Sequence, residues 1–194
     1  MKRIPVLIFI LVALAQLAVP AMLAWGRIQT LTHGRVWKFK TAPVDPEDIV
    51  RGRYVALRFA AATILSHDEA YQKFAAGTKV YFVLKEDADG FAKIERISEK
   101  PLSGDNVIIG EISYFLDEEE GVIFPFNRFW VTEKDAPAAE KAYRENSQRT
   151  KQNAYMTVRV RNGDAALEQL YIDNQPLADY LRAQAAKKLM LAAP

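Results

Sequence analysis

The chain has 194 residues, of which 50% are hydrophobic and 26% are charged, and it contains no cysteine. This composition is typical of a globular protein, and it excludes a disulfide framework and a cysteine nucleophile. Lys2 and Arg3 account for the net charge of +2, because the rest of the chain carries 24 basic and 24 acidic residues. A balanced domain lacks the positive field with which proteins attract nucleic acid, so we expect no nucleic-acid partner.

The N-terminus has the pattern of a membrane anchor. An uncharged apolar run from Ile4 to Trp25 follows Lys2 and Arg3 and has about the ~20 residues that a helix needs to cross a bilayer. Positive residues before the run predict a cytoplasmic N-terminus. A cleavable signal peptide is the alternative, but its apolar core is usually shorter and ends at a small-x-small site. We therefore predict a single-pass signal-anchor at residues 1–26 in the inner (cytoplasmic) membrane.

The remainder divides into a short polar spacer at 27–34 and one exported domain at 35–194, which we expect to be periplasmic or extracellular. The spacer is too short for a flexible tether and predicts a domain close to the membrane surface. The domain has no internal repeat or low-complexity linker. Roughly 160 residues are enough for one independently stable core.

Alternation of polar and apolar residues predicts a series of short strands. In the first of them, Trp37 and Phe39 share the core face and Val36 lies off it. Asp89-Gly90 and Asn162-Gly163 are typical hairpin turns, and Gly110 is a candidate bulge. Besides the strand after Gly52, strands are predicted at 35–41, 78–85, 91–97, 107–115, 154–160 and 166–172.

Three stretches favour helices. Ser66 and Glu69 have the spacing of a capping box, which predicts a short helix ending near Ala76. Residues 135–149 place Ala139, Ala142 and Tyr143 on one stripe, and Pro176 begins a final amphipathic helix. The expected fold class is α+β: an N-terminal transmembrane helix followed by one mainly antiparallel β-rich domain with two or three helices.

The stretch from Asp45 to Ala62 combines a turn with a strand. Pro46 and the acidic residues around it predict a turn, and Gly52 stands where a positive φ or a bulge would open a strand. Val55, Leu57, Phe59 and Ala61 alternate onto one face, which we predict to be core.

The same stretch resembles a known family. Gly52-Arg53-Tyr54-Val55-Ala56-Leu57-Arg58-Phe59 is similar to the signature of the GDYXXLXY proteins, bacterial membrane-anchored proteins without an established activity. Arg53 stands where the signature has an acidic residue, and Phe59 where it has a tyrosine. The resemblance extends more loosely over most of the chain after about Arg35. It implies no activity or cofactor.

Two other segments suggest functional surfaces. Residues 122–130 hold four aromatic side chains and one charge, which predicts a strand that covers the core with a Pro-marked irregularity; any exposed part would be a patch for a partner. Asp117-Glu-Glu-Glu120 is typical of a solvated turn. Calcium loops space their carboxylates differently.

Catalytic motifs are sparse. His33 and His67 lack zinc-ligand spacing, and no Gly-x-Ser-x-Gly or phosphate-binding glycine loop occurs. We expect neither a metal nor a cofactor. One enzymatic alternative is a membrane-tethered Ser/Lys hydrolase resembling signal peptidases, with Ser66 or Ser103 as the nucleophile and Lys79 or Lys85 as the base.

The leading hypothesis is a non-enzymatic module that binds another membrane protein of the envelope. A domain that binds a small ligand in a cleft between sheet and helices is a further alternative. Acidic and basic side chains beside one tyrosine can hold a partner or form local ion pairs. The candidate binding residues are Asp45, Asp48, Arg51, Gly52, Arg53 and Tyr54.

Overall fold

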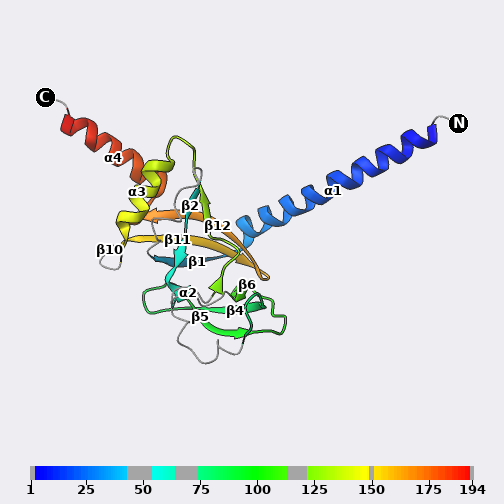
Figure 1. The fold of residues 1–194 in the computed structure, drawn as a ribbon, viewed down its shortest axis with the longest axis horizontal. Coiled ribbons are helices and arrows are strands. Elements are labelled where there is room, and N and C mark those ends of the chain that lie inside the picture. Colours follow the sequence, from blue (N-terminus) through cyan, green and yellow to red (C-terminus); the bar gives the residue numbers. More distant parts are fainter. Residues whose placement is uncertain (1–2, 43–53, 64–73, 113–121, 149–150, 193–194) are drawn as a thin grey trace.

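A computed structural model describes residues 3–42, 54–63, 74–112, 122–148 and 151–192. Helix α1 (Arg3–His33) extends away from the rest of the molecule, as Figure 1 shows. Its part Ile8–His33 is long and apolar enough to cross a membrane, and it is exposed over most of its length. Residues 27–33 of the spacer expected at 27–34 are instead the last two turns of this helix. No residue between Arg27 and His33 breaks a helix, and Gly34 ends it.

The larger sheet is antiparallel, in the order β13-β12-β11-β1-β3. Its strands are β1 (Arg35–Ala42), β3 (Arg58–Phe59), β11 (Ala154–Arg161), β12 (Asp164–Ile172) and β13 (Gln175–Pro176). Asn162 and Gly163, at φ 50° and 94°, form the turn between β11 and β12. Both positive φ values fit a two-residue hairpin turn, and this prediction is confirmed.

A second antiparallel sheet has the order β5-β4-β6-β7. It consists of β4 (Lys79–Glu86), β5 (Ala92–Ser98), β6 (Val107–Ile112) and β7 (Val122–Ile123). The bulge predicted at Gly110 is wrong, because Gly110 lies in regular register opposite Val80. A Cβ there would lie 2.7 Å from both the Phe82 ring and the Ile123 carbonyl oxygen. Glycine is needed for close packing, not for a bulge.

The remaining elements that the structure describes are two pairs of short strands and three helices. Strands β2 (Tyr54–Ala56) and β8 (Arg128–Trp130) pair, as do β9 (Ser147–Gln148) and β10 (Lys151–Gln152). After α1, the described segments contain helices α2 (Ala60–Thr63), α3 (Ala136–Asn146) and α4 (Leu177–Ala192). The predicted α+β class is therefore confirmed. Helix α4 projects from the domain on the side away from α1 (Figure 1).

One hydrophobic core joins the two larger sheets. Phe39 of β1 lies within 6 Å, ring centre to ring centre, of Phe59, Phe124 and Phe126, and Phe82 of β4 contacts Phe124. Trp37 and Phe39 are buried, and Val36 is exposed, as predicted. The buried stripe of α3 contains Ala139, Ala142 and Tyr143, as expected. Most of the helix predicted from Ser66 to Ala76 lies outside the described residues.

Candidate functional site

The described part of the signature is mainly a piece of the core. Val55, Leu57, Phe59 and Ala61 are all less than 10% exposed, which confirms the predicted buried face. The backbone of this stretch does not form the single continuous strand that the alternation predicted. Leu57 separates β2 from β3 because its amide donates to the Asn127 carbonyl at 2.9 Å, and Ala61 already lies in α2.

Tyr54 and Arg58 are half-buried members of the described part of the signature, and Tyr54 lies beside an exposed aromatic residue. Strand β2 pairs with β8 so that Tyr54 lies opposite Trp130, with ring centres 5.4 Å apart in an edge-to-face arrangement. The Arg128 guanidinium lies 5.1 Å from the centre of the Tyr54 ring. Tyr54 is half-buried, but Trp130 is 65% exposed. We call Tyr54, Arg128 and Trp130 the Tyr54–Trp130 surface.

This pairing joins two features that the sequence offered separately, the signature tyrosine and the aromatic segment 122–130. Part of that segment is buried in the core and part lies at the surface. Phe124 and Phe126 belong to the core, as predicted, while Trp130 is exposed and Phe129 is half-buried. The aromatic content of 122–130 predicted a strand that covers the core, but only the pairing with β2 identifies Trp130 as the neighbour of Tyr54.

A cleft of about 480 Å³ adjoins the Tyr54–Trp130 surface and brings in the end of α1 through Arg27. Among the described residues that line it, Arg27 and Arg128 are basic and none is acidic. The lining residues are Arg27, Pro125, Phe126, Asn127, Arg128, Phe129, Trp130 and Leu167.

The other predicted binding residues lie outside the described residues: Asp45, Asp48, Arg51, Gly52 and Arg53. Their role stays a prediction. The acidic run Asp117-Glu-Glu-Glu120 and the histidine His67 also lie outside. Among the residues that the structure describes, no three His, Cys, Asp or Glu side chains form a group able to hold a metal ion.

The residues of the hydrolase hypothesis are scattered. Ser66 lies outside the described residues, and Ser103 is exposed in the loop between β5 and β6. Lys85 pairs with Glu95 at 3.5 Å on the surface. No described hydrogen bond joins Ser103 to Lys79 or Lys85, which leaves this hypothesis without a geometric observation in its favour.

A buried polar cluster near the end of β1 went unnoticed in the sequence. The Thr41 hydroxyl donates to the Ala154 carbonyl at 2.8 Å and lies 3.0 Å from the Ser147 hydroxyl oxygen. The Tyr143 hydroxyl donates to the Ala42 carbonyl at 3.1 Å, and burial raises the pKa of Tyr143 to about 12. Because these hydroxyl groups are buried and bonded to one another or to backbone, they join β1 to α3 and do not face a ligand.

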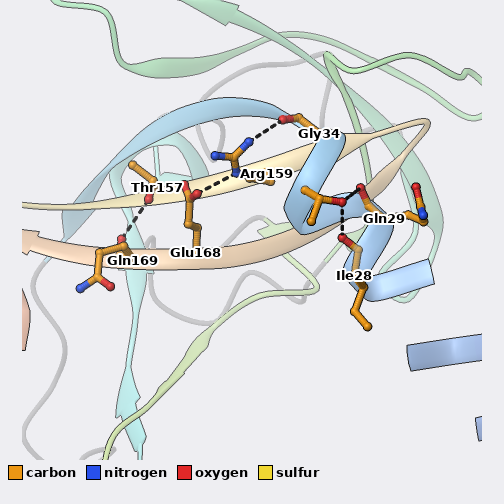
Figure 2. A network of polar contacts seen from close by, with 8 residues as sticks. Ile28, Gln29, Gly34, Thr157, Arg159, Glu168 and Gln169 are labelled. Atoms are coloured by element: carbon orange, nitrogen blue, oxygen red, sulfur yellow. Dashed lines mark hydrogen bonds and ion pairs between the residues drawn. The ribbon is translucent and has the colours of Figure 1, made fainter. Parts of the chain in front are cut away.

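Three arginines join the domain to the last turns of α1 and to Gly34, which follows the helix. Arg27 donates to the Ala165 carbonyl at 2.9 Å, and Arg161 to the Gln29 side-chain oxygen at 3.1 Å. Figure 2 shows Arg159 between two acceptors, the Gly34 carbonyl at 3.2 Å and the Glu168 carboxylate at 2.7 Å. The contacts hold the sheet at a defined place beside the helix.

Gly34 makes this junction compact. A Cβ at this position would lie 2.5 Å from the Thr30 carbonyl oxygen and 3.0 Å from that of Val160. Thr30 itself is only 4% exposed although it lies in the helix that leaves the domain. The chain can therefore pass from helix to strand in direct contact with β11 only because residue 34 has no side chain.

These features define a class: a mainly antiparallel α+β domain fixed to the end of one long apolar helix, with an exposed aromatic and basic surface beside the junction. Within that class, the chain belongs to the GDYXXLXY protein family, whose model matches residues 16–170. The match begins inside α1 and includes both β2 and β8. No curated protein and no solved structure matches the chain.

Proposed function

We propose that the protein is a non-enzymatic module that is anchored in the inner membrane by α1 and binds another membrane protein of the envelope. Its N-terminus is cytoplasmic and its domain lies on the outer side, as Lys2 and Arg3 before the apolar run favour. The partner binds at the Tyr54–Trp130 surface. The segment that precedes Tyr54 in the chain, with Asp45, Asp48, Arg51, Gly52 and Arg53, contributes to the same site.

The observation that carries this proposal is the exposure of Trp130 next to Tyr54 and Arg128. Trp, Tyr and Arg are the residue types that most often dominate protein–protein binding energy. The Trp130 side chain is 65% exposed, so most of it lies outside the hydrophobic core. A large aromatic ring held in position by its neighbours and left open to solvent is typical of a binding surface.

The unpaired edge of β8 favours a partner that binds as an extended segment. Among the strands that the structure describes, β8 is hydrogen-bonded to β2 alone, so its other edge has no strand beside it. Exposed strand edges commonly accept a further strand from another protein. The described residues that line the cleft beside β8 include Arg27 and Arg128 and no acidic residue, which favours a partner segment that carries a carboxylate.

The junction with α1 supports a partner in the same membrane. Arg27, Arg159 and Arg161 bond the sheet to the helix end, and Arg27 also lines the cleft. A domain fixed in this way stays at one height and orientation above the bilayer. A partner anchored beside it meets the Tyr54–Trp130 surface without a long search in three dimensions.

The test is affinity capture of the full-length protein from membranes after in-cell crosslinking, with Trp130→Ala and Arg128→Glu as variants. Arg96→Glu is the matched control, because Arg96 is exposed on β5 in the other sheet. We expect a membrane protein to be captured by the wild type and the control, and lost from both surface variants. Capture of the same protein by all four chains would refute the proposal.

A further inference from the structure

A second cavity lies between α1 and the domain. It has a volume of about 600 Å³, within the range of ~300–1,000 Å³ that is usual for small-molecule sites. One wall is α1, where Met22 and Leu23 are 75% and 72% exposed. The facing wall comes from β6, β7 and the residues that follow β7, with Ile109, Ile123 and Pro125 among its apolar members.

The position of the cavity along α1 places it at the level of lipid headgroups. The apolar run ends at Trp25, and the headgroup layer adds roughly 5–7 Å on each side of the hydrocarbon core. At 1.5 Å per residue, this layer spans about three to five helical residues beyond Trp25. Arg27 and Thr30, which line the cavity, lie within that span, while Met22 and Leu23 lie at its apolar side.

Four charged side chains of both signs line the same cavity. Arg27 and Lys79 are basic, and Glu111 and Asp164 are acidic. None of the four forms an ion pair within the described part of the chain, although Lys79 and Glu111 are opposite each other in the register of β4 and β6. Arg27 uses one of its five N–H groups on the Ala165 carbonyl, which leaves donors for another acceptor.

We propose that this cavity binds the headgroup of a zwitterionic phospholipid with a primary amine, of the phosphatidylethanolamine type. The phosphate accepts hydrogen bonds from Arg27 and Lys79, and the ammonium group donates to Glu111 and Asp164. Met22, Leu23 and Ile123 contact the start of the acyl chains. The inference rests on membrane insertion of α1 in the proposed function, and it is independent of the partner.

The chemistry distinguishes this headgroup from its common alternatives. A choline headgroup has the same net charge, but its quaternary nitrogen has no N–H to donate to the carboxylates. A glycerol headgroup has no cation to place beside Glu111 and Asp164, so these two carboxylates keep their charges without a partner. Both lipids should therefore bind more weakly than phosphatidylethanolamine.

The experiment is native mass spectrometry of the full-length protein from detergent micelles that contain equal amounts of phosphatidylethanolamine, phosphatidylcholine and phosphatidylglycerol. We expect the wild type to retain phosphatidylethanolamine about tenfold over phosphatidylcholine, the effect of one charge-assisted hydrogen bond. The double variant Glu111→Lys/Asp164→Lys should prefer phosphatidylglycerol. Glu95→Lys/Glu99→Lys, with the same change of charge on β5 and just after it, should retain the wild-type preference.

Equal retention of the three lipids by the wild type would overturn the inference, as would an unchanged preference in the cavity variant. Circular dichroism of each variant checks that the charge reversals leave the fold intact. Alkaline extraction of membranes tests insertion separately. A chain that does not insert overturns both the anchoring and this inference, whereas an inserted chain without lipid preference overturns this inference alone.

Discussion

Substitution of Phe59 separates the structural part of the signature from its exposed part. Phe59 is 3% exposed, and its ring centre lies 5.6, 5.9 and 5.4 Å from those of Phe39, Phe124 and Phe126. Truncation of a buried phenylalanine costs about 3–5 kcal/mol, and each edge-to-face pair contributes about 0.5–1.5 kcal/mol beyond its buried area. Because Phe59→Ala removes three pairs, we expect a loss of about 4–5 kcal/mol.

Tyr54→Ala is the matched comparison within the same signature. It removes one cross-strand aromatic pair at the surface, which is worth about 0.2–1 kcal/mol. Domains of this size are stable by only about 5–15 kcal/mol, so the two variants should differ clearly in their urea midpoints. The assay is urea unfolding of the full-length protein in detergent micelles, with circular dichroism as the probe of unfolding.

The two variants should also differ in function. Tyr54→Ala should keep its fold and lose the captured partner, while Phe59→Ala loses stability first. If Tyr54→Ala costs as much free energy of unfolding as Phe59→Ala, the tyrosine is a structural residue and the Tyr54–Trp130 surface is not a binding site. A cost below about 2 kcal/mol for Phe59→Ala would refute the reasoning about the aromatic core.

Three further predictions concern the backbone and pH. Gly34→Ala places a methyl group 2.5 Å from the Thr30 carbonyl oxygen and should lower the thermal unfolding midpoint. Gly26→Ala is the control, because a Cβ at Gly26 has no atom within 4 Å, and it should not lower the midpoint. Equal midpoints of the two variants would contradict the tight junction. Gly110→Ala puts a methyl group in occupied space and should cost about 1–3 kcal/mol in urea unfolding, and an unchanged midpoint would show that β6 shifts freely. Burial raises the pKa of Tyr143 from its ordinary value of 10.0 to about 12 in the folded chain. The unfolded chain therefore ionises first, and stability should fall as pH rises from 10 through 12. The loss is about 2–3 kcal/mol, and unfolding of Tyr143→Phe at each pH should lack it.

The sequence predicted those features whose causes are local. An uncharged run of the right length defined α1 as a candidate membrane span, and Asn162-Gly163 defined the β11–β12 turn through its backbone preferences. The two-residue period assigned Trp37, Phe39, Val55, Leu57 and Phe59 to the core, because one face of each strand is more apolar than the other. The signature identified the family before any contact was known.

Only the tertiary structure decided how distant segments meet. The pairing of Tyr54 with Trp130 depends on the register of β2 and β8, and that register follows from the packing of both strands on a shared core. The junction with α1 depends on Arg159 and Arg161, which on β11 look like ordinary surface residues.

The interruption of the signature strand has the same origin. The Leu57 amide bonds to the Asn127 carbonyl, a partner that alternation of polarity cannot indicate. Period and composition report which side chains avoid water, and they were sufficient for the core. The candidate site instead depends on which exposed side chains lie together, and hydrogen bonds and strand pairs between remote residues determine that.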